Sequence, residues 1–167
     1  MVKTILQGGP VQWGWITMSD QTAMWGRTVA AAALEWVGTP YRHQGSCKGV
    51  GCDCLGLVRG VWRALYGREP EPPVHYSRDW AEAGGEELLL EAVRRHFVTC
   101  PDGKTDTGRL IVFRWRPDVP AKHAGICIDG ERFVHAYEGT AVTVSRLVPQ
   151  WRRRIAGVFA FPERVGA

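Results

Sequence analysis

The sequence lacks any long hydrophobic run. No apolar stretch approaches the roughly 20 residues that a membrane-spanning helix needs. The first ten residues also lack the sustained apolar segment and the small-residue cleavage site of a secretory signal. The chain contains no internal repeat and no low-complexity tract. We therefore expect neither a membrane span nor a secretory signal.

An excess of one charge is also missing. The net charge is only +4, and the hydrophobic and charged fractions of 45% and 23% are close to the average for globular proteins. So small a positive charge does not predict direct binding to nucleic acid. With 167 residues the chain is long enough to bury the core of one domain.

Cysteine pairing cannot be complete, because the chain has an odd number of cysteines: Cys47, Cys52, Cys54, Cys100 and Cys127. Without a secretory signal, reduced thiols are the expectation. A metal or iron-sulfur site built from the first three cysteines is one alternative. Their C-x4-C-x-C spacing, however, matches neither the paired C-x2-C of most zinc sites nor a ferredoxin run. We expect no metal and no cofactor, and the reactivity of one thiol becomes the main question.

Residues 1–18 show no clear periodicity and are interpreted as an N-terminal extension of a domain that spans residues 19–167. Within the domain, apolar residues recur at helical spacing from Gln21 to Val37, and Gly38 ends the pattern. Further helical segments are predicted between Ser77 and His96.

A second helix is predicted from Cys54 to Tyr66, with Asp53 as its cap and Gly67 as its end. Gly56 and Gly60 lie four residues apart in this helix and lower its propensity. A close backbone neighbour would explain both glycines.

After about residue 108 the pattern changes to short segments rich in Val, Ile and Phe, separated by turn residues. Helices followed by an antiparallel meander make an α+β domain, with the N-terminal helices packed on a sheet of about five strands. The predicted strands are Leu110–Trp115, His123–Ile128, Arg132–Tyr137, Ala141–Ser145 and Ile155–Phe161.

Cys54 is the candidate nucleophile. As the first residue of the second helix it would meet free backbone N–H groups and the helix dipole, which lower the pKa of a thiol and stabilise a thiolate. The same N–H groups can stabilise the oxygen that becomes negative when a carbonyl is attacked. The alternative is a buried cysteine that acts as a small hydrophobic residue. The glycine-rich loop before it, residues 45–51, favours an approachable backbone instead.

His123 and His135 are the candidate base and its orienting partner, because they lie at the ends of two strands joined around Asp129-Gly130. A two-residue turn would put them on opposite faces of the sheet. A three-residue loop, Ile128 to Gly130 with Gly130 left-handed, would pair them directly. Spacing alone leaves open that both are half-buried polar residues.

Five segments occur in an order that resembles the NlpC-type cysteine peptidases of bacterial cell-wall turnover, a compact relative of the papain fold. The resemblance runs from about Ala32 to Phe161. It is carried by Gly38–Arg42, Cys52–Val58, Gly108–Leu110, His123–Ile126 and Phe133–Ala136.

The resemblance implies that Cys54 is the nucleophile, His123 the base and His135 the orienting residue. It also implies that the Tyr41 hydroxyl helps on the oxyanion side and that Asp53 faces a substrate ammonium. For Tyr41 packing beside Pro40, and for Asp53 simple helix capping, stay open as alternatives. The implied reaction is cleavage of a peptidoglycan stem peptide after D-glutamate and before the diamino acid.

The segment His43–Gly45 and Leu55 are similar to the branch of the family carried by phage tails and gene-transfer particles. This resemblance implies a tail-tip protein, made in the bacterial cytoplasm, that joins tail-tip or baseplate proteins and opens the wall for DNA entry. Leu55 stands where the family usually has serine, and Arg109 stands where an aspartate is usual. Leu55 removes a hydroxyl expected to contact substrate, so the family's fine specificity does not transfer.

Two other functions stay open. The first is a tail or adaptor protein that keeps the fold without using the site. The second is an amidase or acyltransferase that applies the same cysteine and histidine to another acyl substrate.

Overall fold

The computed structural model describes residues 17–72 and 87–163. It has the predicted α+β class, with helices packed on an antiparallel sheet. The helices are α1 (Met18–Leu34), α2 (Cys54–Tyr66), α4 (Leu88–His96) and α5 (Pro149–Arg152). Most of the predicted extension and residues 73–86 of the predicted helical connector lie outside the described residues. No helix in the described ranges is both long and apolar enough to cross a membrane.

Helix α1 begins three residues before the predicted start at Gln21. Thr17 caps it, because its side chain accepts a hydrogen bond from the Asp20 N–H and the Asp20 carboxylate accepts one from the Thr17 N–H, both at 3.2 Å. The predicted end at Val37 is three residues too late: the helix stops at Leu34, and a turn follows up to Gly38, whose φ is +89°. The capping box therefore moves the start of the helix back by about one turn.

The main sheet has six antiparallel strands in the order β3-β8-β4-β5-β6-β7. Each of the five longer strands begins within one residue of its predicted start. Strand β3 was not predicted, because two residues cannot display an alternating pattern. A separate two-stranded ribbon, β1 with β2, lies just before α2. The strands are β1 (Ser46–Cys47), β2 (Gly51–Cys52), β3 (Val98–Thr99), β4 (Leu110–Phe113), β5 (His123–Cys127), β6 (Arg132–Ala136), β7 (Val142–Arg146) and β8 (Ile155–Ala160).

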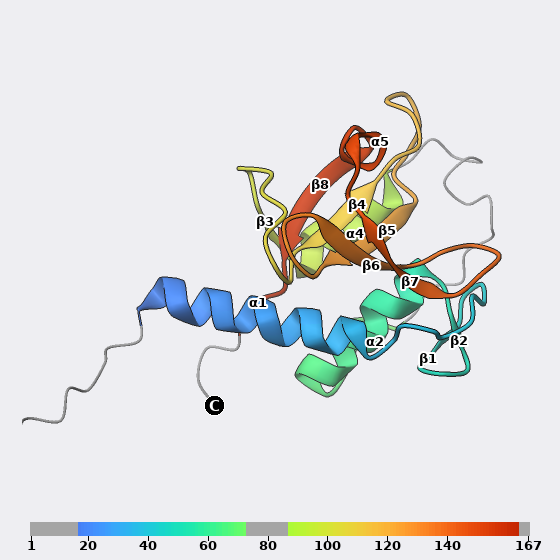
Figure 1. The fold of residues 1–167 in the computed structure, drawn as a ribbon, viewed down its shortest axis with the longest axis horizontal. Coiled ribbons are helices and arrows are strands. Elements are labelled where there is room, and N and C mark those ends of the chain that lie inside the picture. Colours follow the sequence, from blue (N-terminus) through green and yellow to red (C-terminus); the bar gives the residue numbers. More distant parts are fainter. Residues whose placement is uncertain (1–16, 73–86, 164–167) are drawn as a thin grey trace, which may run out of the picture.

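Both faces of the sheet are covered. Every residue of β4 is buried, so side chains of alternating direction enter two separate clusters. The larger cluster joins the sheet to α1, α2 and α4, which include Val29, Leu57 and Leu90. The smaller cluster contains Phe113 and Phe133 and is covered by Trp151 of α5. Figure 1 shows α2 crossing α1, with the start of α2 next to the sheet and α5 at the opposite end of the sheet.

Both glycines of α2 have close neighbours, but only Gly56 has the backbone neighbour that was predicted; the neighbour of Gly60 is a side chain. A Cβ atom on Gly56 would collide with the carbonyl oxygen of Gly45, and one on Gly60 would collide with the ring of Trp36. Both glycines are buried. Because these positions have no side chain, α2 lies directly against the loop at Gly45 on one side and against Trp36, which follows α1, on the other.

Replacing Gly56 with alanine tests this packing. Helix propensity alone would stabilise the variant by about 1 kcal/mol. The collision with the Gly45 carbonyl should outweigh that gain and lower the free energy of unfolding by about 1–3 kcal/mol, as measured by urea denaturation. Gly130→Ala is the matched control, because nothing lies within 4 Å of its missing Cβ. Equal stability of both variants would contradict the packing argument.

Candidate active site

Helix α2 starts at Cys54 as predicted, and Asp53 is its cap. The Asp53 carboxylate accepts hydrogen bonds from the Gly56 N–H at 2.8 Å and from the Gln44 N–H at 2.7 Å. At the other end Gly67 adopts a left-handed conformation with φ +83°. Asp53 therefore fixes both the first turn of α2 and the loop before it, and Cys54 stands at the free N-terminus.

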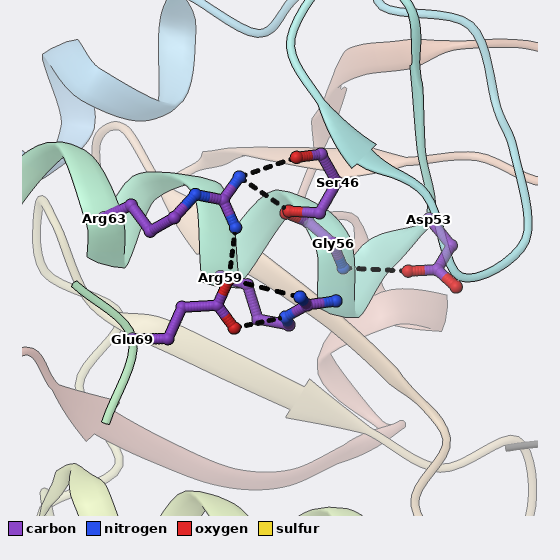
Figure 2. Close-up of polar contacts among 6 residues, drawn as sticks. All are labelled: Ser46, Asp53, Gly56, Arg59, Arg63 and Glu69. Carbon is purple, nitrogen blue, oxygen red and sulfur yellow. Dashed lines mark hydrogen bonds and ion pairs between the residues drawn. The ribbon is translucent and has the colours of Figure 1, made fainter. Parts of the chain in front are cut away.

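A polar cluster fastens the β1–β2 ribbon to the same helix (Figure 2). Ser46 of β1 donates through its hydroxyl to the Gly56 carbonyl at 2.6 Å, and its own carbonyl accepts from Arg63 at 2.6 Å. Glu69 forms ion pairs with Arg63 and Arg59. Because these groups bind the helix from outside the cleft, they fix the position of Cys54 without occupying its surroundings.

The sulfur of Cys54 lies against the backbone on both sides of His123. Its thiol donates a long hydrogen bond of 3.9 Å to the Lys122 carbonyl. The N–H groups of Ala124, Leu55 and Cys54 also act on the sulfur and favour the thiolate. The start of α2 and the start of β5 therefore meet at this atom.

The expected acidification of Cys54 is wrong for the resting protein. Burial, reinforced by the negative charge of Asp53, raises the pKa of the Cys54 thiol to about 12. The N–H groups at the helix start lower the pKa but do not offset this. The sulfur rests as a neutral thiol, which agrees with its hydrogen bond to a carbonyl acceptor.

The two candidate histidines are in direct contact. Nε2 of His123 lies 2.9 Å from Nδ1 of His135. The other nitrogen of His135, Nε2, lies 2.8 Å from the hydroxyl of Ser145. His123 is 8% exposed and His135 fully buried. Since Nε2 of His123 is engaged, its Nδ1 is the atom left for a proton from the cleft.

The hairpin that joins them differs from the prediction. Val134 pairs with Ile126, so extending the register puts His135 opposite Gly125, two residues along from His123. The loop is Asp129–Glu131, one residue later than expected. The two histidines share a face, as the functional hypothesis required, but they are diagonal neighbours rather than a direct pair.

The turn chemistry explains the shift of the hairpin. The Asp129 carboxylate accepts from the N–H groups of Glu131 and Arg132 at 2.9 and 2.7 Å. Gly130 does not adopt the expected left-handed conformation. A side-chain cap therefore shapes this turn, and the glycine does not.

Aromatic rings enclose both imidazoles. The ring of Trp115 stacks on His123 at 5.8 Å between centroids, and Phe113 lies 5.9 Å away. His135 lies 4.6 Å from Phe133 and 5.3 Å from Trp151. None of these four aromatic residues was among the predicted site residues.

This enclosure keeps the imidazoles neutral. Burial, helped by the neighbouring His135, lowers the pKa of His123 to about 3. Burial likewise lowers the pKa of His135 to about 4. Both rings are therefore able to accept a proton only when a negative partner forms next to them.

A cleft of about 390 Å³ opens onto this arrangement. It brings together all the predicted site residues except the deeper His135. It adds Trp115, Lys122 and Glu138, which no pattern in the sequence marks as site residues. The lining residues are Tyr41, His43, Asp53, Cys54, Leu55, Trp115, Lys122, His123, Ala136, Tyr137 and Glu138.

The other cysteines do not join the site. All five thiols are free. Cys47 is exposed on β1, whereas Cys52 and Cys127 are buried, Cys127 in the core as expected for a strand residue. Cys100 accepts a hydrogen bond from Arg109 at 2.8 Å. Within residues 17–72 and 87–163, no group of three or more potential metal ligands occurs.

Comparison with known proteins covers most of the domain. A sequence profile described as the NlpC/P60 family matches residues 38–159. The murein DD-endopeptidase MepS/murein LD-carboxypeptidase of Escherichia coli K12 is 28% identical over 121 residues, which make up 72% of this chain and 54% of that protein. The gamma-DL-glutamyl hydrolase of Bacillus subtilis 168 is 27% identical over 134 residues, 80% of this chain and 29% of the relative. The chain thus spans about half or less of the length of these relatives.

Solved structures share the fold. The NlpC/p60 domain of the peptidoglycan hydrolase SagA superposes with a TM-score of 0.55 at 21% identity, over 81% of this chain and 98% of that one. A lipoprotein-like NLP/P60 family protein of Staphylococcus aureus superposes with a TM-score of 0.56 at 20% identity, over 92% and 45% of the two chains.

Titration of the two imidazoles tests the electrostatics of the site. We expect NMR to find the rings of His123 and His135 neutral at pH 5, where a free imidazole with a pKa of about 6.5 is mostly protonated. Trp115→Ala should admit water to the His123 ring and raise its pKa, while Trp115→Phe should preserve it. Titration of both wild-type rings near pH 6.5 would refute this description.

Proposed function

The chain belongs to the NlpC/P60 family of cysteine peptidases and cell-wall hydrolases, and on that premise we propose that it is a cysteine endopeptidase acting on the stem peptides of peptidoglycan. One observation carries the proposal. The Cys54 sulfur lies at a helix N-terminus, against the backbone that flanks His123, and both side chains line one cleft. His123 in turn contacts His135. Nucleophile, base and orienting residue thus form a connected set.

The first step is attack on the carbonyl carbon of the scissile amide. The thiol proton moves to Nδ1 of His123 as the sulfur forms its bond to carbon, so the charged pair exists only during the reaction. The carbonyl oxygen becomes negative and is stabilised by backbone N–H groups at the start of α2. Tyr41 lines the same cleft, and its hydroxyl contributes on this side.

The intermediate then breaks its carbon–nitrogen bond. His123 returns the proton to the leaving amine, and a thioester remains on Cys54. A water molecule, deprotonated by His123, attacks the thioester and releases a carboxylic acid and the free thiol. Neutral His123 is needed at the start of each half-reaction, which its lowered pKa ensures.

The substrate assignment rests on the names of the relatives, a murein endopeptidase and a gamma-DL-glutamyl hydrolase. The glutamyl bond in the name of the second relative supports cleavage between D-glutamate and the diamino acid, whereas the family's contacts around that bond are not carried over because of Leu55. Asp53 contributes negative charge for a substrate ammonium, although each of its oxygens already accepts one backbone N–H. A carboxylate oxygen can accept a second hydrogen bond. Leu55 gives the cleft an apolar wall where the family usually has a serine.

We further propose that the protein works at the tail tip of a phage-like particle. The support is the sequence of the segment His43–Gly45 together with Leu55, which is similar to that branch of the family. Tail-tip or baseplate proteins are the partners in this proposal. Mass spectrometry of purified particles should find the chain in the tail fraction, and its absence from particles would count against the assignment.

Replacing Cys54 with alanine tests the nucleophile. Incubation with purified peptidoglycan followed by mass spectrometry of muropeptides should show cleavage reduced by at least about a thousandfold, since the covalent step is lost. Cys47→Ala removes an exposed thiol nearby and should cleave like the wild type. The masses of the products also identify the bond, which distinguishes a peptidase from an amidase. Wild-type cleavage by Cys54→Ala would remove this residue from the role.

The two histidines should differ in their effects. His123→Ala removes the proton acceptor and should reduce kcat about as strongly as the loss of Cys54. His135→Ala removes only the group that orients the base, so we expect a smaller loss, roughly 10- to 100-fold. Steady-state kinetics on a soluble muropeptide measures both. A larger effect at position 135 than at position 123 would reverse the assigned roles.

A further inference from the structure

A third polar residue continues the line that starts at His123. Ser145 lies on β7, and its hydroxyl is 2.8 Å from Nε2 of His135. In the register of β6 with β7, Thr143 is opposite His135 and Ser145 is opposite Phe133. Ser145 and Thr143 share a face because they are two residues apart, so Ser145 is a diagonal neighbour of His135. His123, His135 and Ser145 thus lie on one face of three successive strands.

The direction of the hydrogen bonds along this line decides which nitrogen of His123 carries a proton. A neutral imidazole has one N–H donor and one bare nitrogen acceptor. If Ser145 accepts from Nε2–H of His135, then Nδ1 of His135 is bare and accepts from Nε2–H of His123. That leaves Nδ1 of His123 bare and able to take the thiol proton. If Ser145 donates, every bond in the line reverses and Nδ1 of His123 is already protonated.

The uncharged Ser145 hydroxyl is also compatible with the positive charge that forms on His123 during the reaction. During attack His123 becomes a cation 2.9 Å from His135, and a second positive charge there would oppose it. Ser145 has no charge, so it holds a proton on Nε2 of His135 without drawing the ring into the cationic form. Both rings then stay neutral between reactions, in keeping with their burial.

We propose that Ser145 is a positioning residue that accepts a hydrogen bond from His135 and thereby sets the tautomer in which His123 acts as a base. This inference rests on the proposed function, since it assigns a role within the same reaction. Ser145 reaches the cleft only through His135, so its effect should appear in kcat and in the tautomers of the rings and not in the binding of substrate.

The test combines kinetics with ¹⁵N NMR of the histidine rings in the full chain. In the wild type both rings should carry the proton on Nε2. Ser145→Ala should populate the Nδ1–H forms of His135 and His123 and reduce kcat about tenfold, with KM within twofold of the wild type. Ser145→Thr keeps the hydroxyl and should restore the wild-type tautomer and most of kcat.

Thr143→Ala is the matched control, because it removes a neighbouring hydroxyl on the same face and strand. It should change neither tautomer nor kcat. The inference is overturned if Ser145→Ala leaves the tautomers unchanged, or if the threonine variant fails to restore them. The NMR readout needs no substrate, so an inactive wild type with Ser145-dependent tautomers would refute the peptidase proposal and leave the positioning role standing.

Discussion

The structure depends on the contact between the N-terminus of α2 and the first residues of β5. There the Cys54 sulfur touches the Lys122 carbonyl and comes under the influence of the Ala124 N–H, on either side of His123. The contact needs a helix that can approach closely, which Gly56 permits, and a first turn that is capped, which Asp53 provides. A larger residue at position 56 or an uncapped start would move the sulfur away from the strand.

The same contact leaves Cys54 half-buried and His123 buried. Burial raises the pKa of the thiol and lowers the pKa of the imidazole, so the pair rests uncharged. An ion pair would be favoured only if the attraction between the charges exceeded the cost of burying them, and inside a protein that cost is several kcal/mol per ion. Here the aromatic rings of Trp115 and Phe113 add to the cost by excluding water from His123. The groups therefore become charged during attack, when the developing oxyanion and the backbone N–H groups share the charge.

The sequence predicted the structural features that depend on interactions between residues close together in the chain. Asp53 and Gly67 gave both ends of α2 because a capping carboxylate and a left-handed glycine act within one turn of the helix. The strands from Leu110 onward were found from composition alone.

The pairing of His123 with His135 was only half predicted. Their common face was a requirement of the functional hypothesis, and the register confirms it. The offset depended on the Asp129 side chain, whose hydrogen bonds displaced Gly130 from its expected role. Ser145 and Trp151 could not be predicted as neighbours of His135. The position of Ser145 follows from the register of β6 with β7, and that of Trp151 follows from the packing of α5 on the sheet.

The pH dependence of Cys54 alkylation tests the uncharged resting pair most directly. The rate of reaction with iodoacetamide would be followed at the peptide that contains Cys54, so that the other thiols do not contribute. A thiol with a pKa near 12 should react slowly from pH 5 to pH 8, and its rate should keep rising as the pH increases further. A fast rate that is constant down to about pH 5 would reveal a preformed thiolate–imidazolium pair and contradict the account.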